Sequence, residues 1–131
     1  MIKGIMIYPD GKIEVINYLN EFDFPNYFDT HTEVITFGEI EDNMPSMAYH
    51  CLFTKDMQFN KKASDIATIL RYFISSGREI KIYGKALMLN EYDDEMKDIT
   101  IEKLNDLLSK TINIINLLYD TNYDKELFLI E

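Results

Sequence analysis

Apolar and polar residues alternate on both sides of a turn near the N-terminus. Ile5 and Ile7 precede the turn and Ile13 and Val15 follow it, and this period of two is typical of strands with one buried face. Between them, Pro9-Asp10-Gly11 favours a type I turn, because proline presets φ and glycine tolerates a positive φ. The pattern predicts a β-hairpin that opens the fold.

Two more strands are expected in the next forty or so residues. Residues 32–37 alternate again, and residues 47–54 are rich in β-favouring side chains. The polar segment 38–46 between them predicts an antiparallel connection. Residues 17–29 follow no clean period, so we expect a loop with one helical turn there.

The second half of the chain predicts two helices and a strand. Residues 62–76 follow the helical period, and Gly77 stands where a helix commonly ends. Residues 80–89 predict a buried strand, in which Gly84 indicates a bulge or a close backbone approach. Thr100 is a suitable N-cap for a second helix. The apolar stripe of that helix comprises Ile101, Leu104, Leu107, Leu108, Ile112, Ile115 and Leu118.

Together these elements predict a single α+β domain spanning residues 1–131. We expect an antiparallel sheet of about five strands that opens with a β-hairpin and is covered on one face by two helices. Residues 91–98 are expected to form an acidic loop. Residues 127–130 are compatible with either a short strand or a loose tail.

Composition narrows the possible functions. The 131 residues include 13 basic and 23 acidic side chains, a net charge of −10, which repels duplex nucleic acid and anionic membranes. No run of 18 apolar residues occurs, so no transmembrane helix is expected. The N-terminal segment does not resemble a signal peptide. The single cysteine excludes an internal disulfide and fits a reducing compartment, so we expect a cytoplasmic protein.

The charge is unevenly distributed along the chain. Residues 1–53 carry nine acids and two bases, residues 54–89 three acids and seven bases, and residues 90–131 eleven acids and four bases. The basic centre predicts either a site for an anionic small ligand, such as a nucleotide, or simple neutralisation of the acidic flanks. The candidate ligand-binding residues are Lys62, Arg71, Arg78 and Lys85.

The acidic flanks suggest a surface that competes for a basic groove on a partner protein. The alternative is that these acids only keep a small domain soluble. The candidate partner-binding residues are Glu39, Glu41, Asp42, Asp93, Asp94 and Glu95.

The sequence contains few of the residue patterns that catalysis requires. His50 and Cys51 are adjacent, and adjacent side chains of a strand point to opposite faces, so they cannot act on each other. Two histidines and one cysteine have no spacing typical of a metal site. The five glycines are isolated, so no phosphate-binding loop is predicted. We therefore expect a protein that is not an enzyme and has no cofactor.

Three segments of the chain, taken in order, resemble a known family. The similarity covers residues 2–98 and points to the small phage and mobile-element proteins of the domain of unknown function family numbered 3846. Residues 18–28 lack the leucine-rich helix of that pattern, and the helix after Thr100 looks like an addition. The resembling segments are Lys3–Ile7 with Pro9–Gly11 and Ile13–Val15, Asn60 with Ala63 and Ala67, and Ile82–Leu87 followed by Asp93 and Asp94.

The resemblance implies no catalytic residues but does imply a context, namely a phage or prophage accessory protein that acts inside a bacterium. A non-enzymatic inhibitor of a bacterial defence protein is the leading hypothesis. A nucleotide-binding sponge and a toxin-neutralising immunity protein are the alternatives, and self-association through the second helix or a sheet edge is compatible with each. Some rings of Phe22, Phe24, Tyr27 and Phe28 are expected either to contact a partner or to cover an end of the sheet.

Overall fold

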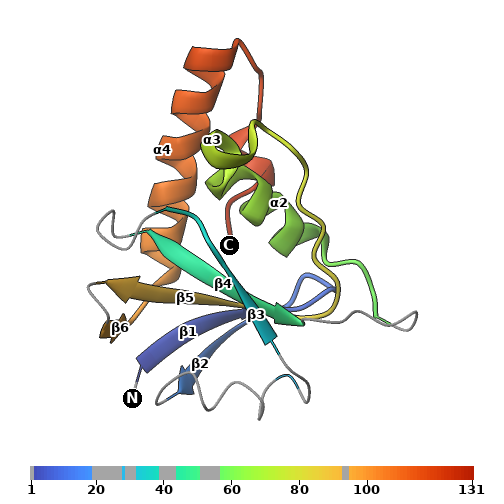
Figure 1. The fold of residues 1–131 in the computed structure, drawn as a ribbon, viewed down its shortest axis with the longest axis vertical. Helices are drawn as coiled ribbons and strands as arrows, with labels where there is room; N and C mark the ends of the chain where they lie inside the picture. Colours follow the sequence, from blue (N-terminus) through green and yellow to red (C-terminus); the bar gives the residue numbers. More distant parts are fainter. Residues whose placement is uncertain (1, 19–27, 29–31, 39–43, 51–56, 93–94) are drawn as a thin grey trace.

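The computed structural model describes residues 2–18, 28, 32–38, 44–50, 57–92 and 95–131. The strands are β1 (Ile2–Ile7), β2 (Ile13–Tyr18), β3 (Thr32–Thr36), β4 (Pro45–His50), β5 (Ala86–Tyr92) and β6 (Glu95–Lys97), and the helices are α2 (Lys61–Leu70), α3 (Tyr72–Ser75), α4 (Ile101–Tyr119) and the 3₁₀ turn η3 (Lys125–Leu127) (Figure 1).

The described strands form one sheet in which every pairing is antiparallel. Its order is β2-β1-β5-β4-β3, and the short β6 pairs with β5 outside this path. Helices α2 and α4 lie on the same side of the sheet (Figure 1). The predicted α+β fold, with an opening hairpin and two helices over one face of an antiparallel sheet, is confirmed.

The opening hairpin has the predicted turn. Gly11 N–H donates to the Tyr8 carbonyl over 2.9 Å, and Tyr8 N–H donates to the Lys12 carbonyl over 2.9 Å. Gly11 has a φ of +90°, which a residue with a Cβ rarely adopts. The turn therefore brings β2 back along β1 in the register that pairs Ile5 with Val15.

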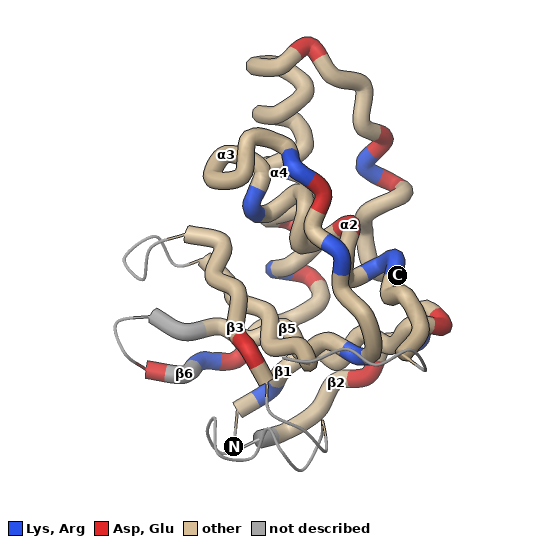
Figure 2. Tube along the Cα trace, turned by 45° about the vertical axis from the view of Figure 1, so that its right-hand side comes forward, with Lys and Arg blue, Asp and Glu red and all other residues tan. Residues whose placement is uncertain are grey.

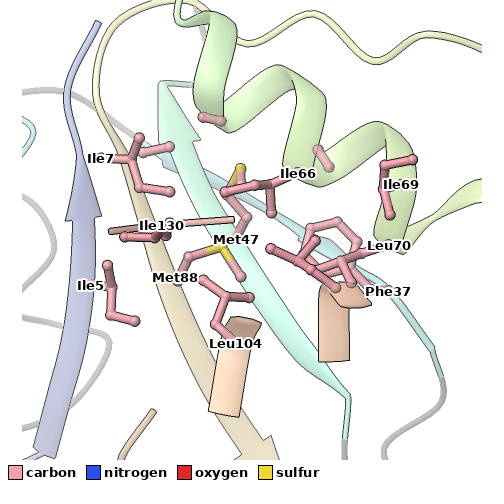
Figure 3. Close-up of a cluster of buried hydrophobic side chains, with 14 of the residues drawn as sticks. Ile5, Ile7, Phe37, Met47, Ile66, Ile69, Leu70, Met88, Leu104 and Ile130 are labelled. Atoms are coloured by element: carbon pink, nitrogen blue, oxygen red, sulfur yellow. The ribbon is translucent and has the colours of Figure 1, made fainter. Parts of the chain in front are cut away.

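The main core lies between the sheet and the helices (Figure 3). β5 is the central strand, between β1 and β4, so the helix-facing side chains of Ile5, Met47 and Met88 are fully covered. Removal of this apolar surface from water is the main stabilising contribution to the fold. The residues labelled in Figure 3 are Ile5, Ile7, Phe37, Met47, Ile66, Ile69, Leu70, Met88, Leu104 and Ile130.

The opposite face of the sheet is also apolar. Phe28 is buried there, so this ring of the predicted aromatic loop covers the sheet, whereas Phe22, Phe24 and Tyr27 lie outside the described residues. The second cluster comprises Met6, Ile16, Phe28, Ala48, Leu87 and Leu89.

Asn60 fastens the start of α2 to the sheet. Its side-chain oxygen accepts a hydrogen bond from Ala63 N–H over 3.0 Å, which caps the helix. Its amide nitrogen donates to the carbonyls of Ile7, over 3.0 Å, and Gly84, over 2.9 Å. Asn60 is fully buried, so one side chain joins a helix, the end of β1 and the segment before β5.

Among the described residues, the segment before β5 makes only one isolated antiparallel bridge, between Tyr83 and Phe59, and is otherwise bonded to side chains of α2. Ile80 N–H donates to Thr68 Oγ1 over 2.9 Å, and Ile82 N–H donates to Ser64 Oγ over 2.8 Å. The predicted strand over residues 80–89 is therefore wrong in its first part, and β5 begins at Ala86. Side chains of the helix satisfy backbone groups that a strand would have paired with a neighbour.

Gly84 confirms the predicted close approach. It has a φ of +74°, and a Cβ built on it would lie 2.7 Å from Cδ2 of His50. His50 in turn lies edge-on to Phe28, with 5.2 Å between the ring centroids. Only a glycine lets the chain pass this close to the end of β4.

Three other predicted elements differ from the structure. The helix expected over residues 62–76 is divided at Arg71, which leaves helical angles with φ −100° and ψ 11°. The acidic loop expected over residues 91–98 is partly strand, because β6 folds back on β5. Residues 127–130 are neither a strand nor a loose tail, since Ile130 is buried and exchanges two hydrogen bonds with the side chain of Asn105.

α4 extends beyond the sheet that it covers. Its 19 residues span about 28 Å, and its C-terminal half runs past the sheet beside α3 (Figure 1). Of the helices in the described ranges, none has both the length and the apolar character required to cross a membrane.

Substitution Asn60→Ala should lower the free energy of unfolding by about 3 kcal/mol, because it leaves buried backbone groups unpaired. Thr100→Ala is the matched control, since Thr100 caps α4 with a single exposed hydrogen bond to Lys103 N–H. The control should lose only about 1 kcal/mol. Urea denaturation of both variants measures the difference, and equal losses would contradict the linking role of Asn60.

Substitution Gly84→Ala should also destabilise the fold, by about 3 kcal/mol, since left-handed strain adds to overpacking against His50. Gly11→Ala carries comparable strain but meets no atom within 4 Å, so about 1 kcal/mol is expected. Thermal unfolding compares the two variants. If the Gly84→Ala protein were as stable as the Gly11→Ala protein, the close approach of residue 84 to His50 would not be a constraint on stability.

Candidate functional site

The chain turns sharply after α3, and this turn positions Tyr72. Ser76 and Gly77 both adopt left-handed angles, with φ of 56° and 78°, and Gly77 N–H donates to the Tyr72 carbonyl over 3.0 Å. A Cβ on Gly77 would lie 2.9 Å from the Tyr72 ring. The predicted helix-ending role of Gly77 is thus confirmed, and the glycine lets the ring pack on the backbone.

Tyr72 is the centre of a cluster of aromatic rings. Its ring centroid lies 5.3 Å from that of Tyr119 and 6.1 Å from that of Tyr123. Phe73 lies 6.1 Å from Tyr119, and Tyr123 lies 5.8 Å from Phe128. Burial raises the pKa of Tyr72, and a side-chain hydrogen bond with Tyr123 raises it further. The cluster holds α3, the end of α4 and the C-terminal segment together.

Large apolar side chains around this cluster are exposed to solvent. Leu117 and Leu118 are 81% and 66% exposed, and the other members are 46–57% exposed. The rings of Phe73 in α3 and Tyr119 in α4 are in contact, so the apolar side chains of the two helices form one continuous surface. We call this set the distal apolar surface, and it comprises Phe73 and Ile74 of α3 with Ile114, Leu117, Leu118 and Tyr119 of α4.

The distal apolar surface exists because α4 remains apolar beyond the core. Leu104, Leu108, Ile112 and Ile115 face the sheet and α2 and are buried. In the last turn, Leu117, Leu118 and Tyr119 follow one another at about 100° per residue, so apolar side chains cover more than half of the circumference, and Asn116 occupies the remaining side. An apolar face this wide is normally buried. Leu118 ends the predicted apolar stripe but is 66% exposed, because the helix there has run past the sheet and α2.

Charge is missing from the same part of α4. No residue from Thr111 to Tyr119 is charged, and Asp120 follows directly. The centres of protein interfaces have few charged residues and many aromatic ones. The composition of this surface is therefore that of an interface centre.

The predicted basic site residues make separate contacts. Nζ of Lys62 donates to the carbonyls of Leu129, over 2.7 Å, and Leu127, over 3.3 Å, and burial lowers the pKa of this amine. Nη1 of Arg71 donates to the Thr36 carbonyl over 3.1 Å. These cations satisfy backbone carbonyls of the C-terminal segment and of β3.

The other two basic residues lie elsewhere. Nζ of Lys85 is 5.8 Å from the centroid of the Phe28 ring, which belongs to the opposite face of the sheet. Arg78 is exposed in the turn after α3. Figure 2 shows Lys and Arg dispersed along the chain. The structure does not bring Lys62, Arg71, Arg78 and Lys85 together into one site.

Most of the acidic candidates lie where the structure gives no description. Glu39, Glu41, Asp42, Asp93 and Asp94 are outside the described residues. Glu95 is exposed at the start of β6. The acidic partner-binding surface stays a prediction.

The histidines and the cysteine form no described site. Cys51 and His31 are outside the described residues, and His50 packs against Phe28. Within the described ranges, no three His, Cys, Asp or Glu side chains are grouped closely enough to hold a metal ion.

Sequence reasoning missed the distal apolar surface although its signal was present. The predicted stripe from Ile101 to Leu118 omits Ile114, which lies along its edge beside Leu107 and Leu118, and Leu117, which widens the apolar surface on that side of the helix. Apolar residues on several sides of one uncharged turn were the available sign of an exposed contact surface.

Comparisons with known proteins return nothing for this chain: no family model, no curated protein and no solved structure matches it. The resemblance to family 3846 stays a hypothesis.

Substitution Lys62→Met should loosen the C-terminal segment, because two carbonyls lose a charged donor. We expect faster amide hydrogen exchange over residues 127–131 and a loss of about 1 kcal/mol in stability. Arg78→Met, which removes an exposed charge with no hydrogen bond to a described side chain, should change neither. Unaltered exchange in the Lys62→Met protein would contradict a structural role for this lysine.

Proposed function

We propose that the chain is a non-enzymatic accessory protein of a phage or mobile element that binds and neutralises a bacterial defence protein. The distal apolar surface carries this proposal. Its six side chains offer on the order of 700 Å² per chain, close to the roughly 800 Å² that each partner buries in a standard interface.

The negative charge of the protein favours a partner whose binding groove is surrounded by basic residues. The distal apolar surface is uncharged, whereas Asp120 adjoins it and the whole chain carries a net charge of −10. Two copies of such a chain repel each other at long range, while a positively charged protein is attracted. The favoured partner therefore has an apolar groove flanked by lysine and arginine.

The position of the distal apolar surface suits an inhibitor that blocks its partner by filling a pocket on it. The surface is held by the Tyr72 cluster, which limits its movement, and a rigid apolar anchor binds with little loss of conformational entropy. Leu117 and Leu118 project furthest into solvent and are the expected anchors for a partner's pocket.

The double substitution Leu117→Lys and Leu118→Lys should abolish inhibition. Both side chains are largely exposed, so folding should be preserved, and lysine suits the C-terminal end of a helix. Loss of two anchors should weaken binding at least 100-fold. The control is Val15→Lys with Val34→Lys, which adds the same charge at residues that are 50% and 49% exposed on edge strands.

The measurement uses bacteria that each carry one defined defence system. The wild-type chain and the valine control should restore phage plating on one of these strains, and should co-elute with the purified defence complex. The leucine variant should do neither. Inhibition that survives in the leucine variant, or a protein that forms only a complex with itself or with a toxin, would overturn the proposal.

A further inference from the structure

A pocket of about 250 Å³ lies at the opposite end of α4 from the distal apolar surface. Its wall is the first half of α4, and its floor includes Ile99 and Leu104, which are buried. Pro45 and Asn90, paired across β4 and β5, close one side. Sites that enclose drug-sized molecules measure roughly 300–1,000 Å³, so a molecule of that size would fill this pocket and extend into solvent past its exposed rim.

Asn90 is a polar residue at a core position. Ala86 and Met88 of β5 belong to the core beneath the helices, and alternation along a strand puts Asn90 on that same face. Its Oδ1 is buried and accepts no hydrogen bond from any residue that the structure describes. Its amide nitrogen donates to the Asp98 carbonyl over a long 3.4 Å.

A buried acceptor without a donor destabilises a fold unless another group supplies the hydrogen bond. Asn90 lines the pocket, so a ligand there can supply it. The ligand must then carry an N–H or O–H group near its buried end.

The mouth of the pocket is positively charged. Lys103 and Lys110 both line it and are seven residues apart, which puts them about two helical turns apart on the same face of α4. Asp106 lies between them. None of these three forms an ion pair with a described residue, so one excess positive charge faces the pocket of a chain whose net charge is −10.

These features favour a ligand with a hydrogen-bond donor at one end and an anion at the other, and the apolar side chains of Pro45, Ile99 and Leu107 suit an apolar body between them. An asparagine side chain matches the adenine edge, because its oxygen accepts from N6–H and its nitrogen donates to N7. Pro45 and Leu107 can contact the faces of the ring, and lysines bind phosphate as point charges. We propose that this pocket binds a small adenine nucleotide, with its base at Asn90 and its phosphate at Lys103 and Lys110.

Titration calorimetry with adenosine 5′-monophosphate tests the proposal. Purine riboside 5′-monophosphate, which lacks the 6-amino group, should bind at least tenfold more weakly, and adenosine, which lacks the phosphate, likewise. No binding of adenosine 5′-monophosphate at millimolar concentration, or equal binding of all three compounds, would overturn it. Equal binding of inorganic phosphate would reduce the site to a simple anion contact and would also overturn it.

Variants locate the site. Lys103→Ala with Lys110→Ala should weaken binding at least tenfold, whereas Arg78→Ala with Lys81→Ala, which removes two exposed charges elsewhere, should not. Asp106→Asn should strengthen binding several-fold, because it removes a like charge beside the phosphate. Asn90→Leu should abolish binding yet raise the thermal unfolding midpoint, since it removes the unpaired acceptor.

The nucleotide-binding proposal and the proposed inhibitory function can be tested independently of each other. The Leu117→Lys and Leu118→Lys variant should bind adenosine 5′-monophosphate as the wild type does, because Leu117 lies about two turns beyond Lys110, the last residue of α4 that lines the pocket. Loss of nucleotide binding in that variant, or an effect of Arg78→Ala with Lys81→Ala equal to that of the pocket variant, would contradict the assigned location.

Discussion

The hydrogen bonds of Asn60 are the interaction on which the rest of the structure depends. They join the start of α2 to the end of β1 and to the Gly84 carbonyl, and Ser64 and Thr68 extend the same contact along the helix to Ile82 and Ile80. A buried amide that satisfies three backbone groups leaves few alternative positions for the helix. The path of α2 therefore sets where α3 and the aromatic cluster lie.

The two ends of α4 differ in how much of the core they contact. Its first half packs on the sheet and α2. Its last turn is held by the Tyr72 cluster and by hydrogen bonds between the Asn116 side chain and residues Thr121 and Tyr123, and it presents Leu117 and Leu118 to solvent. A helix longer than the layer it covers has an uncovered end, and here that end is apolar. The pocket and the distal apolar surface are thus consequences of one helix, at its two ends.

The net charge of −10 does not describe the local electrostatics. Lys62 and Arg71 are engaged by backbone carbonyls and Lys85 by an aromatic ring, so the basic centre of the sequence is divided among structural contacts. Lys103 and Lys110, in a segment that is acidic as a whole, line a pocket. Proximity along the chain was therefore a poor guide to which cations act together.

Local patterns were sufficient for the hairpin, the helices and the fold class, because period, turn residues and caps act over a few neighbouring residues: Pro9-Asp10-Gly11, Gly77 and Thr100 each behave as predicted. The start of β5, the exposure of Leu118 and the environment of Asn90 depended on partners far away in the chain. A stripe of leucines is the same whether or not a layer covers it, and an asparagine in a strand is unremarkable until its face is known. Only the tertiary structure decided which side chains are covered, because burial is a property of the assembled layers.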